Sequence, residues 1–393
     1  MNRRGVLSWA AGWLAALALA LGAGPGAGAD AAVIADPVTF GIVLPLTGDR
    51  DVYGRSLLTG MQARARQINA AGGVLGGRPV AFEIVDTESR PDRAAGAVDE
   101  LAGRPGVLAI FGPHTSGEFA AMLGPARERG LAVIAPKATQ NGITRGNPWA
   151  FRITFSNGFQ GMAMARFLTE KRGLGRFALL TDRRHGYTTD LAEAFRETVE
   201  GRGAGTIVAD VAFGQDGGED FGPAIGQIAQ ADPEAVFISA YADDVQDIVR
   251  QAGRAGLRAV LCGGDSWDVE SVLQGSGFRL EGSYYIANFS LASPDPAVAA
   301  FAESMREAGL EVPDSTAALG YDTVTVGVLA LERAAEPTRR GIRDALPGLS
   351  DLPLITGKTT ITPEGEALKS VYIMKVVREG DALSAVEAER LDP

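Results

Sequence analysis

The sequence predicts an α/β protein whose parallel sheets are covered by helices on both faces. Short runs of consecutive apolar residues recur along the chain, as in strands buried on both faces, and stretches with helical periodicity alternate with them. The chain has 393 residues, of which 46% are hydrophobic and 22% charged, so it can form the cores of two or three domains.

Each element follows from its local pattern. The first strand reads VTFGIVL at 38–44, and a helix is expected over 53–71, where Leu57, Met61 and Ile68 share one face. The same apolar signal predicts further strands at 81–86, 107–111, 131–135, 177–181, 235–239 and 259–263. Between the strands, helices are expected at 117–129, 187–201, 219–230 and 244–256.

Residues 1–29 are typical of an export signal that is cleaved near Ala29. Arg3 and Arg4 precede an apolar run at 6–21, and Ala-Gly-Ala at 27–29 fits a small-x-small cleavage site. The run is shorter than the roughly 20 residues that span a bilayer, and no later segment reaches that length. NRRGVL also fits a twin-arginine signal, so either export route is open. We expect the mature chain in the periplasm.

Charge and cysteine content exclude several functions. The formal charge is −11, and removing the signal takes away two arginines and no acids, which leaves −13. A chain this acidic, without a basic stripe, is not expected to bind nucleic acid or anionic lipid. The single Cys262 permits no intramolecular disulfide, and its place at the end of an apolar strand predicts a buried free thiol.

The polar residues follow the predicted strands. In a parallel sheet, ligands bind beyond the carboxyl ends of the strands. The segments at those ends are rich in hydroxyl, amide, acidic, aromatic and glycine residues, which indicates the lining of a pocket. They are 46–54, 86–90, 112–117, 136–142, 182–187, 240–244 and 263–268.

No known catalytic pattern occurs among these segments. The sequence contains no dinucleotide fingerprint after the first strand, no P-loop and no G-x-S-x-G elbow. Two histidines and one cysteine, far apart, form no zinc motif, so neither a metal nor a cofactor is expected. His114 and Ser116 resemble a base and a nucleophile, but two residues apart in a tight turn they are poorly placed to react. We therefore expect a binding protein and not an enzyme.

Several motifs in one order resemble the branched-chain amino-acid binding proteins, the leucine-binding class of type I periplasmic binding proteins. They include FGIVLPLTG, INAAGGVLGG, FGPHTS, IAPKAT, FRITFSNGFQG, AVFISAYADD, GGDSWD and ALGYD, and they cover about 38–378. The resemblance implies two doubly wound parallel-sheet lobes joined by three crossovers. Lobe 1 would hold 36–157 and 289–369, and lobe 2 would hold 158–288 and 370–393.

The resemblance also implies a function. The chain would be the monomeric extracytoplasmic receptor of an ABC importer, which captures an amino acid or a related small carboxylate between the lobes and serves a permease in the inner membrane. A sensor that reports ligand occupancy to a membrane signalling partner is the alternative.

The family's ligand-binding positions are matched by several residues. Ser116 matches a serine that, with backbone amides at the start of the next helix, holds the ligand carboxylate. Thr139 matches a threonine that contacts both the carboxylate and the ammonium of the ligand. Asp265 falls where an acid pairs with the α-ammonium, and Tyr241 precedes it at the family's distance.

Two further tyrosines match aromatic positions. Tyr53 corresponds to a tyrosine that lines the side-chain pocket, and Tyr187 to an aromatic residue of lobe 2 that closes over the ligand. DRRHGY at 182–187 has one more residue than the family's loop, with glycine and tyrosine in reversed order. We expect His185, in the same loop, to face solvent.

Two departures from the family bear on the ligand. Lys137 stands where a small residue is usual: inside the pocket its ammonium would disfavour an α-amino acid and favour a second carboxylate, whereas at the rim it would leave the specificity unchanged. We expect the rim. Trp267 also replaces a small residue, and we expect it to narrow the pocket or stack on a flat ligand. Outside the site, Tyr321 and Asp322 are expected to anchor a long helix over 318–334, and Asp243 and Asp244 to stabilise a helix start.

Overall fold

Parallel pairing of apolar strands builds a five-stranded sheet from the first part of the chain. The computed structural model describes residues 36–214, 220–307 and 313–393. The sheet has the order β2-β1-β3-β4-β5, and all its neighbouring strands are parallel, as predicted. Its strands are β1 (Val38–Leu44), β2 (Val80–Asp86), β3 (Val107–Phe111), β4 (Ala132–Ala135) and β5 (Ala150–Arg152).

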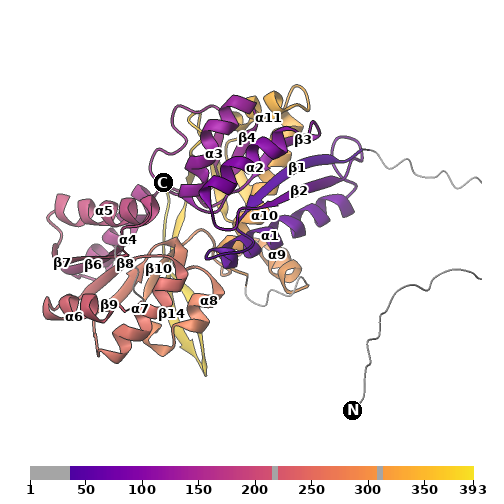
Figure 1. Ribbon diagram of the computed structural model, residues 1–393. Helices are drawn as coiled ribbons and strands as arrows, with labels where there is room; N and C mark the ends of the chain where they lie inside the picture. Colours follow the sequence, from indigo (N-terminus) through magenta and orange to yellow (C-terminus); the bar gives the residue numbers. More distant parts are fainter. Residues whose placement is uncertain (1–35, 215–219, 308–312) are drawn as a thin grey trace, which may run out of the picture. The chain divides into compact units, whose positions relative to one another are not determined.

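Helices cover both faces of this sheet (Figure 1). Alternate residues of β1 point to opposite faces: Phe40 and Ile42 share a core with α1 and α10, while Val43 shares one with α2 and α3. The helices are α1 (Asp51–Ala70), α2 (Pro91–Ala102), α3 (Ser116–Arg129), α10 (Ser315–Arg333) and α11 (Arg339–Ala345). The continuous apolar runs in the sequence therefore reflect burial on two sides.

Two glycines let α1 and α10 pack closely. A Cβ atom at Gly60 would lie 1.9 Å from the carbonyl oxygen of Ala317, and one at Gly320 would lie 2.1 Å from that of Leu57. The backbones of the two helices thus touch where a side chain would keep them apart. Asp322 on α10 accepts hydrogen bonds from backbone amides at 355 and 356, which confirms its predicted anchoring role.

The second large sheet has seven strands in the order β15-β14-β10-β9-β8-β6-β7. Strands β6 to β10 pair in parallel, whereas β14 pairs antiparallel with both β10 and β15. The strands are β6 (Arg176–Asp182), β7 (Thr206–Phe213), β8 (Ala235–Ser239), β9 (Val260–Gly263), β10 (Tyr284–Ala287), β14 (Val371–Glu379) and β15 (Ala382–Leu391). The sequence analysis did not predict the antiparallel pair.

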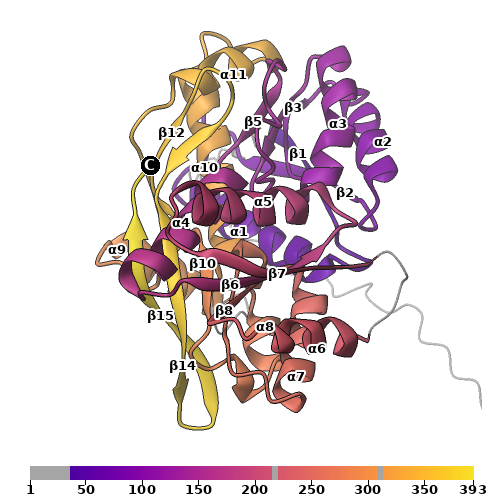
Figure 2. The same cartoon turned by 90° about the vertical axis from the view of Figure 1, so that its left-hand side faces the viewer.

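Two groups of helices lie on opposite sides of the strands of this sheet in both views (Figures 1 and 2). On one side are α4 (Asn157–Arg166), which continues as a π-helix over Phe167–Lys171, and α5 (Gly186–Gly201). On the other are α6 (Gly222–Gln230), α7 (Ala242–Arg254) and α8 (Glu270–Gly275). Helix α7 begins two residues earlier than predicted and carries Asp243 and Asp244 in its first turn, where they offset the positive end of the helix dipole.

The remaining elements are short. A three-stranded antiparallel sheet joins the core of α10 and α11 and consists of β11 (Leu352–Leu354), β12 (Gly357–Ile361) and β13 (Ala367–Lys369). Helix α9 (Pro296–Glu307) precedes α10, and 3-10 turns occur at Asp265–Trp267, Phe278–Leu280 and Leu346–Gly348.

The chain passes between the cores of the two large sheets three times: between β5 and α4, after β10, and between β13 and β14. This confirms the expected type of fold, while the exact residues that bound the two lobes stay a prediction. Residues 1–29, the expected signal, lie outside the described residues. None of the helices in the described ranges is long and apolar enough to cross a lipid bilayer.

Candidate functional site

Loops from both large sheets meet at a small cavity beyond the ends of their strands. This inner cavity has a volume of about 10 Å³, enough for about one water molecule. It is lined by His114, Thr115, Ser116 and Lys137 from the loops after β3 and β4, and by Tyr187, Tyr241, Asp265 and Ser266 from the loops after β6, β8 and β9. The structure thus brings together five of the predicted site residues, and their roles in binding stay predictions.

A glycine turn places the start of α3 at this cavity. Gly112 has a φ of +121°, and a Cβ atom there would lie 2.0 Å from the carbonyl oxygen of Val43. Only glycine therefore lets β3 end so close to β1. The turn directs residues 114–116 toward the loops of the other sheet.

Thr115 caps helix α3, which leaves Ser116 free for another role. The Oγ1 atom of Thr115 accepts a hydrogen bond from the Glu118 amide at 3.1 Å, and the Glu118 carboxylate accepts one from the Thr115 amide at 3.2 Å. Ser116 accepts a hydrogen bond from the Gln140 amide at 3.2 Å, so its own hydroxyl proton can be donated elsewhere. First-turn amides of a helix have no partner within the helix and favour an anion.

Lys137 lies inside the protein, so the rim position expected from the sequence is wrong. Its side chain is 2% exposed, and its Nζ donates to the Asp265 carbonyl and to Thr316 Oγ1, both at 3.0 Å. The same nitrogen lies 3.8 Å from Asp265 Oδ2. Two hydrogen bonds and the nearby Asp265 carboxylate hold the ammonium in place, and this overcomes the tendency of lysine to reach solvent.

Asp265 is the acidic side chain of the inner cavity. Its Oδ1 accepts a hydrogen bond from the Tyr187 hydroxyl at 3.1 Å, and its backbone amide donates to Gln160 Oε1 at 3.1 Å. Burial raises the pKa of the Asp265 carboxyl, while the Lys137 ammonium and the Tyr187 hydroxyl oppose that rise. Tyr187 thus lines the inner cavity, where its hydroxyl binds a protein carboxyl group, and its role in closing over a ligand stays a prediction.

Aromatic rings pack around the cavity. The Tyr53 ring stacks on His114 with 4.2 Å between centroids, and the Tyr241 ring lies 6.2 Å from each of them. The Tyr53 hydroxyl donates to the Ser266 carbonyl at 2.8 Å and accepts from the Ala242 amide at 2.9 Å. The sequence analysis expected Tyr53 to line the pocket for the ligand side chain, but Tyr53 does not line the inner cavity. Its hydroxyl instead links α1 to the loops of the seven-stranded sheet.

Polar atoms without a hydrogen-bond partner gather at this place. His114 Nδ1, Thr139 Oγ1 and Asp265 Oδ2 are three of the thirteen buried side-chain atoms without a partner in the described residues. Such groups are costly in a protein interior unless a ligand or water pairs with them. Thr139 does not line the inner cavity, but it follows Lys137 by two residues and its carbonyl accepts from the Asn157 amide at 2.7 Å.

His114 and Ser116 do not form a base and nucleophile pair. Burial, and then the charges of Lys137 and Arg50, hold the pKa of His114 well below its usual value, so the imidazole is neutral. Its ring stacks on Tyr53 and its Nδ1 contacts no partner in the described part of the chain. His114 therefore serves as a wall of the cavity.

A larger outer cavity adjoins the inner one and shares Thr115, Tyr187 and Tyr241 with it. Its volume is about 440 Å³. The other residues that line it are Asp49, Arg50, Ser89, Pro91, Gly117, Arg184, His185 and Gly186. Basic side chains and the starts of α3 and α5 thus surround a space that suits an anion.

The basic groups of the outer cavity are held by neighbours. Arg50 lies 4.2 Å above the Tyr241 ring and 3.3 Å from Asp243 Oδ2, so it bridges the two sheets. Arg184 pairs with Asp182 at 2.8 Å and with Asp244 at 2.5 Å. His185 is 39% exposed and also faces the cavity, so its expected solvent position is only partly correct.

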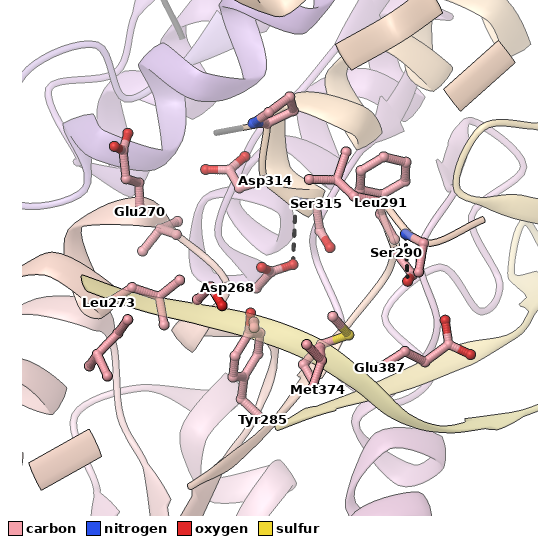
Figure 3. A pocket seen from close by; sticks show the side chains of 18 of the residues that line it. Asp268, Glu270, Leu273, Tyr285, Ser290, Leu291, Asp314, Ser315, Met374 and Glu387 are labelled. Carbon is pink, nitrogen blue, oxygen red and sulfur yellow. Dashed lines mark hydrogen bonds between the residues drawn. The ribbon is translucent and has the colours of Figure 1, made fainter. Parts of the chain in front are cut away.

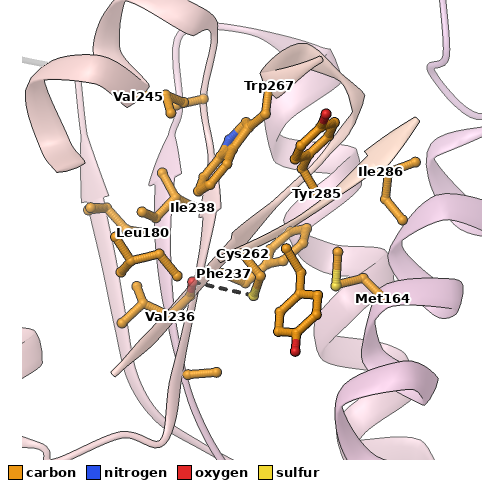
Figure 4. Packing of buried hydrophobic residues seen from close by; sticks show 14 of the residues in the cluster. Met164, Leu180, Val236, Phe237, Ile238, Val245, Cys262, Trp267, Tyr285 and Ile286 are labelled. Atoms are coloured by element: carbon orange, nitrogen blue, oxygen red, sulfur yellow. Dashed lines mark hydrogen bonds between the residues drawn. The ribbon is translucent and has the colours of Figure 1, made fainter. Parts of the chain in front are cut away.

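Trp267 lies in the core and not in the pocket, which corrects the sequence analysis. The 3-10 turn at Asp265–Trp267 directs the indole to the interior, where it packs near Val245 and Tyr285 (Figure 4). It is fully buried, and a Cβ atom on Gly263 would lie 2.3 Å from the ring. Cys262 is a buried free thiol, as predicted, and donates to the Val236 carbonyl at 3.4 Å.

A separate apolar cavity of about 300 Å³ lies between α8, β10, β14 and β15 (Figure 3). Leu273, Leu291 and Met374 are among its apolar lining residues. Its charged lining side chains are all acidic: Asp268, Glu270, Asp314 and Glu387. The walls of this cavity thus offer no basic side chain to a carboxylate, unlike those of the inner and outer cavities.

The sequence analysis missed several contributors to the site. Arg50 and Arg184 lie within the predicted polar segments but were not singled out, and Thr316 lies on a helix outside those segments. Ser266, whose carbonyl accepts a hydrogen bond from Tyr53, was not singled out, although it lies between Asp265 and Trp267, which were. Within the described residues, no group of three or more His, Cys, Asp or Glu side chains is placed to hold a metal ion.

Comparison with known proteins identifies the family. The family model described as periplasmic binding protein matches residues 37–381. A Leu/Ile/Val-binding protein of Rhizobium johnstonii, BraC3, is 25% identical over 351 residues, which is 88% of this chain and 94% of that one. The chain therefore belongs to the periplasmic binding protein family.

Solved structures define the class more closely. The leucine-binding protein LivK of Thermotoga maritima superposes with a TM-score of 0.83 and is 27% identical, covering 91% of this chain and 99% of that one. The substrate-binding protein LivJ of Streptococcus pneumoniae, in complex with isoleucine, has a TM-score of 0.82 and 30% identity, covering 90% and 100%. The chain thus has the type I fold and belongs with the branched-chain amino-acid binding proteins.

Proposed function

We propose that the mature chain is an extracytoplasmic receptor of an ABC importer, which captures an amino acid or a related small carboxylate at the inner cavity. The observation that carries this proposal is the start of α3. Its free amides and the Ser116 hydroxyl meet buried, unpartnered polar atoms of His114, Thr139 and Asp265. The isoleucine bound to the LivJ relative supports a ligand of this size and kind.

Capture requires the two sheets to separate and close. The inner cavity holds about one water, so a ligand enters only when the loops move apart. The contacts that hold the two sets of loops together include Tyr53 with Ser266, Lys137 with Asp265, and Arg50 with Asp243. A ligand that bridges both sets of loops would add to them and favour the closed arrangement.

The test is calorimetric titration of the mature protein with amino acids and small carboxylic acids. We expect at least one to bind with micromolar affinity, which needs about −8 kcal/mol. Ser116→Ala should weaken that binding by about tenfold or more, because a hydrogen bond to a charged group contributes about 1.5–3 kcal/mol. Ser304→Ala is the control, since the Ser304 hydroxyl bonds within α9 at the Phe301 carbonyl. Absence of binding, or equal affinity in Ser116→Ala, would reject the site.

Export and assembly are tested separately. The protein should appear in the periplasmic fraction with Asp30 as its first residue, and as a monomer in size-exclusion chromatography. Uptake of the ligand should require the inner-membrane permease encoded with it. Retention in the cytoplasm, or uptake that is independent of this chain, would contradict the receptor role.

A further inference from the structure

The ammonium group of Lys137 already lies beside Asp265, the acidic side chain of the inner cavity. Lys137 and Asp265 are the charged residues that line this cavity in the described structure. The Lys137 Nζ is fixed by the Asp265 carbonyl and Thr316 Oγ1, and it lies 3.8 Å from Asp265 Oδ2. The other carboxyl oxygen of Asp265 accepts from Tyr187. A ligand ammonium would therefore have to share Asp265 Oδ2 with Lys137, at a distance where two positive charges repel strongly.

Several donors around the cavity are unused, beside the unpartnered Asp265 Oδ2, which accepts, and His114 Nδ1, which can donate or accept. An ammonium has three N–H groups, and two of those on Lys137 are used within the protein. Ser116 already accepts a bond from the Gln140 amide, so its hydroxyl proton is available. The first-turn amides of α3 add further donors. Unused donors favour an anion, and the unused carboxyl oxygen, Asp265 Oδ2, already lies 3.8 Å from the Lys137 ammonium.

Other acidic side chains near Lys137 do not add a carboxylate to the lining of the inner cavity. The charge of Lys137 opposes the rise that burial causes in the pKa of Asp268 and of Asp314, but these two acids line the apolar cavity of Figure 3 and not the inner cavity. Each is held by hydrogen bonds of its own, Asp268 from the Ser315 amide and Asp314 from Ser56 Oγ and the Ala317 amide. Asp265 is therefore the one carboxylate among the described residues that lines the inner cavity and could pair with a ligand ammonium.

We propose that Lys137 takes the place of a ligand ammonium, so that the ligand of this chain is a carboxylate without an α-amino group. This inference rests on the proposed function and narrows it. It makes Lys137 the residue that determines specificity: it disfavours amino acids by repulsion and attracts a carboxylate with its third N–H.

The test uses ligands in pairs that differ only by the amino group: leucine with 4-methylpentanoate, phenylalanine with 3-phenylpropanoate, and glutamate with glutarate. Each is titrated into the wild-type mature protein by calorimetry. In every pair that binds, the amine-free acid should have a dissociation constant at least tenfold lower than that of the amino acid. An amino acid that binds as tightly as its partner would overturn the inference while leaving the proposed function intact. If no member of any pair binds, the proposed function fails and the inference falls with it.

A variant pair assigns the preference to Lys137. Lys137→Met keeps the length of the side chain and removes its charge, and it should shift the ratio within a pair toward the amino acid by at least tenfold. Lys358→Met is the matched control, because Lys358 is 66% exposed and pairs with Asp351 on the β11–β12 hairpin. An unchanged ratio in folded Lys137→Met would overturn the role of Lys137. Circular dichroism checks the fold, and if the variant is unfolded the wild-type ratios alone decide.

Discussion

The hydroxyl group of Tyr53 is expected to act as a latch between the two sheets. It donates to the Ser266 carbonyl at 2.8 Å and accepts from the Ala242 amide at 2.9 Å, and the residue is 1% exposed. In Tyr53→Phe the ring can still stack on His114, but both backbone groups would be buried without partners when the loops are together. When the loops are apart these groups meet water in either protein. The substitution therefore penalises the closed arrangement alone.

The size of the effect follows from two lost hydrogen bonds. At about 1 kcal/mol each, they amount to about 2 kcal/mol, which corresponds to a roughly thirtyfold weaker affinity for a ligand that binds the closed form. Calorimetric titration with the tightest ligand measures this change directly.

A second tyrosine provides the control. The Tyr321 hydroxyl binds Gln67 and Arg64, so it joins α10 to α1 without crossing between the sheets. Tyr321→Phe should lower thermal stability and leave the affinity within about twofold, since it costs the open and closed forms equally. Equal affinities of wild type and Tyr53→Phe, or equal losses of affinity in Tyr53→Phe and Tyr321→Phe, would refute the proposal that Tyr53 stabilises the closed arrangement.

Three further predictions concern stability and reactivity. Gly60→Ala should destabilise the protein by about 1–3 kcal/mol or more, seen as a lower melting temperature, because its Cβ atom would lie 1.9 Å from the Ala317 carbonyl oxygen. Gly96→Ala is the control: its Cβ atom meets open space on α2, so the substitution should be neutral or stabilising. Burial raises the pKa of the Asp268 carboxyl to about 7. Between about pH 4 and 7 the folded state therefore keeps a proton on Asp268 that the unfolded state has released. Protonated Asp268 favours the folded state, and this stabilisation is lost as the pH rises through 7. Asp268→Asn should therefore raise the melting temperature at pH 8 more than at pH 5, and an equal change at both would contradict the assignment. Burial also raises the pKa of Cys262, so a thiol reagent should react with it only when denaturant is added, and rapid reaction with the native protein would be the opposite result.

The parallel strands could be predicted because burial on two faces leaves a continuous apolar run in the sequence. Strand β8 reads AVFIS, and all five of its residues are buried. Strand β15 gave no such signal, since most of its residues are exposed or only partly buried, and its pairing with β14 depends on contacts across a hairpin. The pattern thus predicted seven strands of the two large sheets, and it missed the antiparallel pair as well as β5, β7 and the buried β10.

The strand-end rule identified the segments that line the inner cavity, but it could not give the direction of each side chain. Asp265 and Trp267 are two residues apart in one 3-10 turn, yet the acid faces the inner cavity and the indole enters the core. Lys137 was expected at the rim because lysine tends to extend its ammonium to solvent. The sequence could not show its partners, since Asp265 is 128 positions away and Thr316 is 179. Only the folded chain brings the ammonium group, its two hydrogen-bond acceptors and the Asp265 carboxylate together.

A crystal structure of the wild-type protein with its tightest-binding carboxylic acid would test the central claim most directly. The account predicts that the ligand carboxylate lies at the start of α3, within hydrogen-bonding distance of Ser116, with Lys137 still beside Asp265. A carboxylate bound instead by Arg50 and Arg184 in the outer cavity, or a Lys137 side chain displaced to solvent, would contradict it.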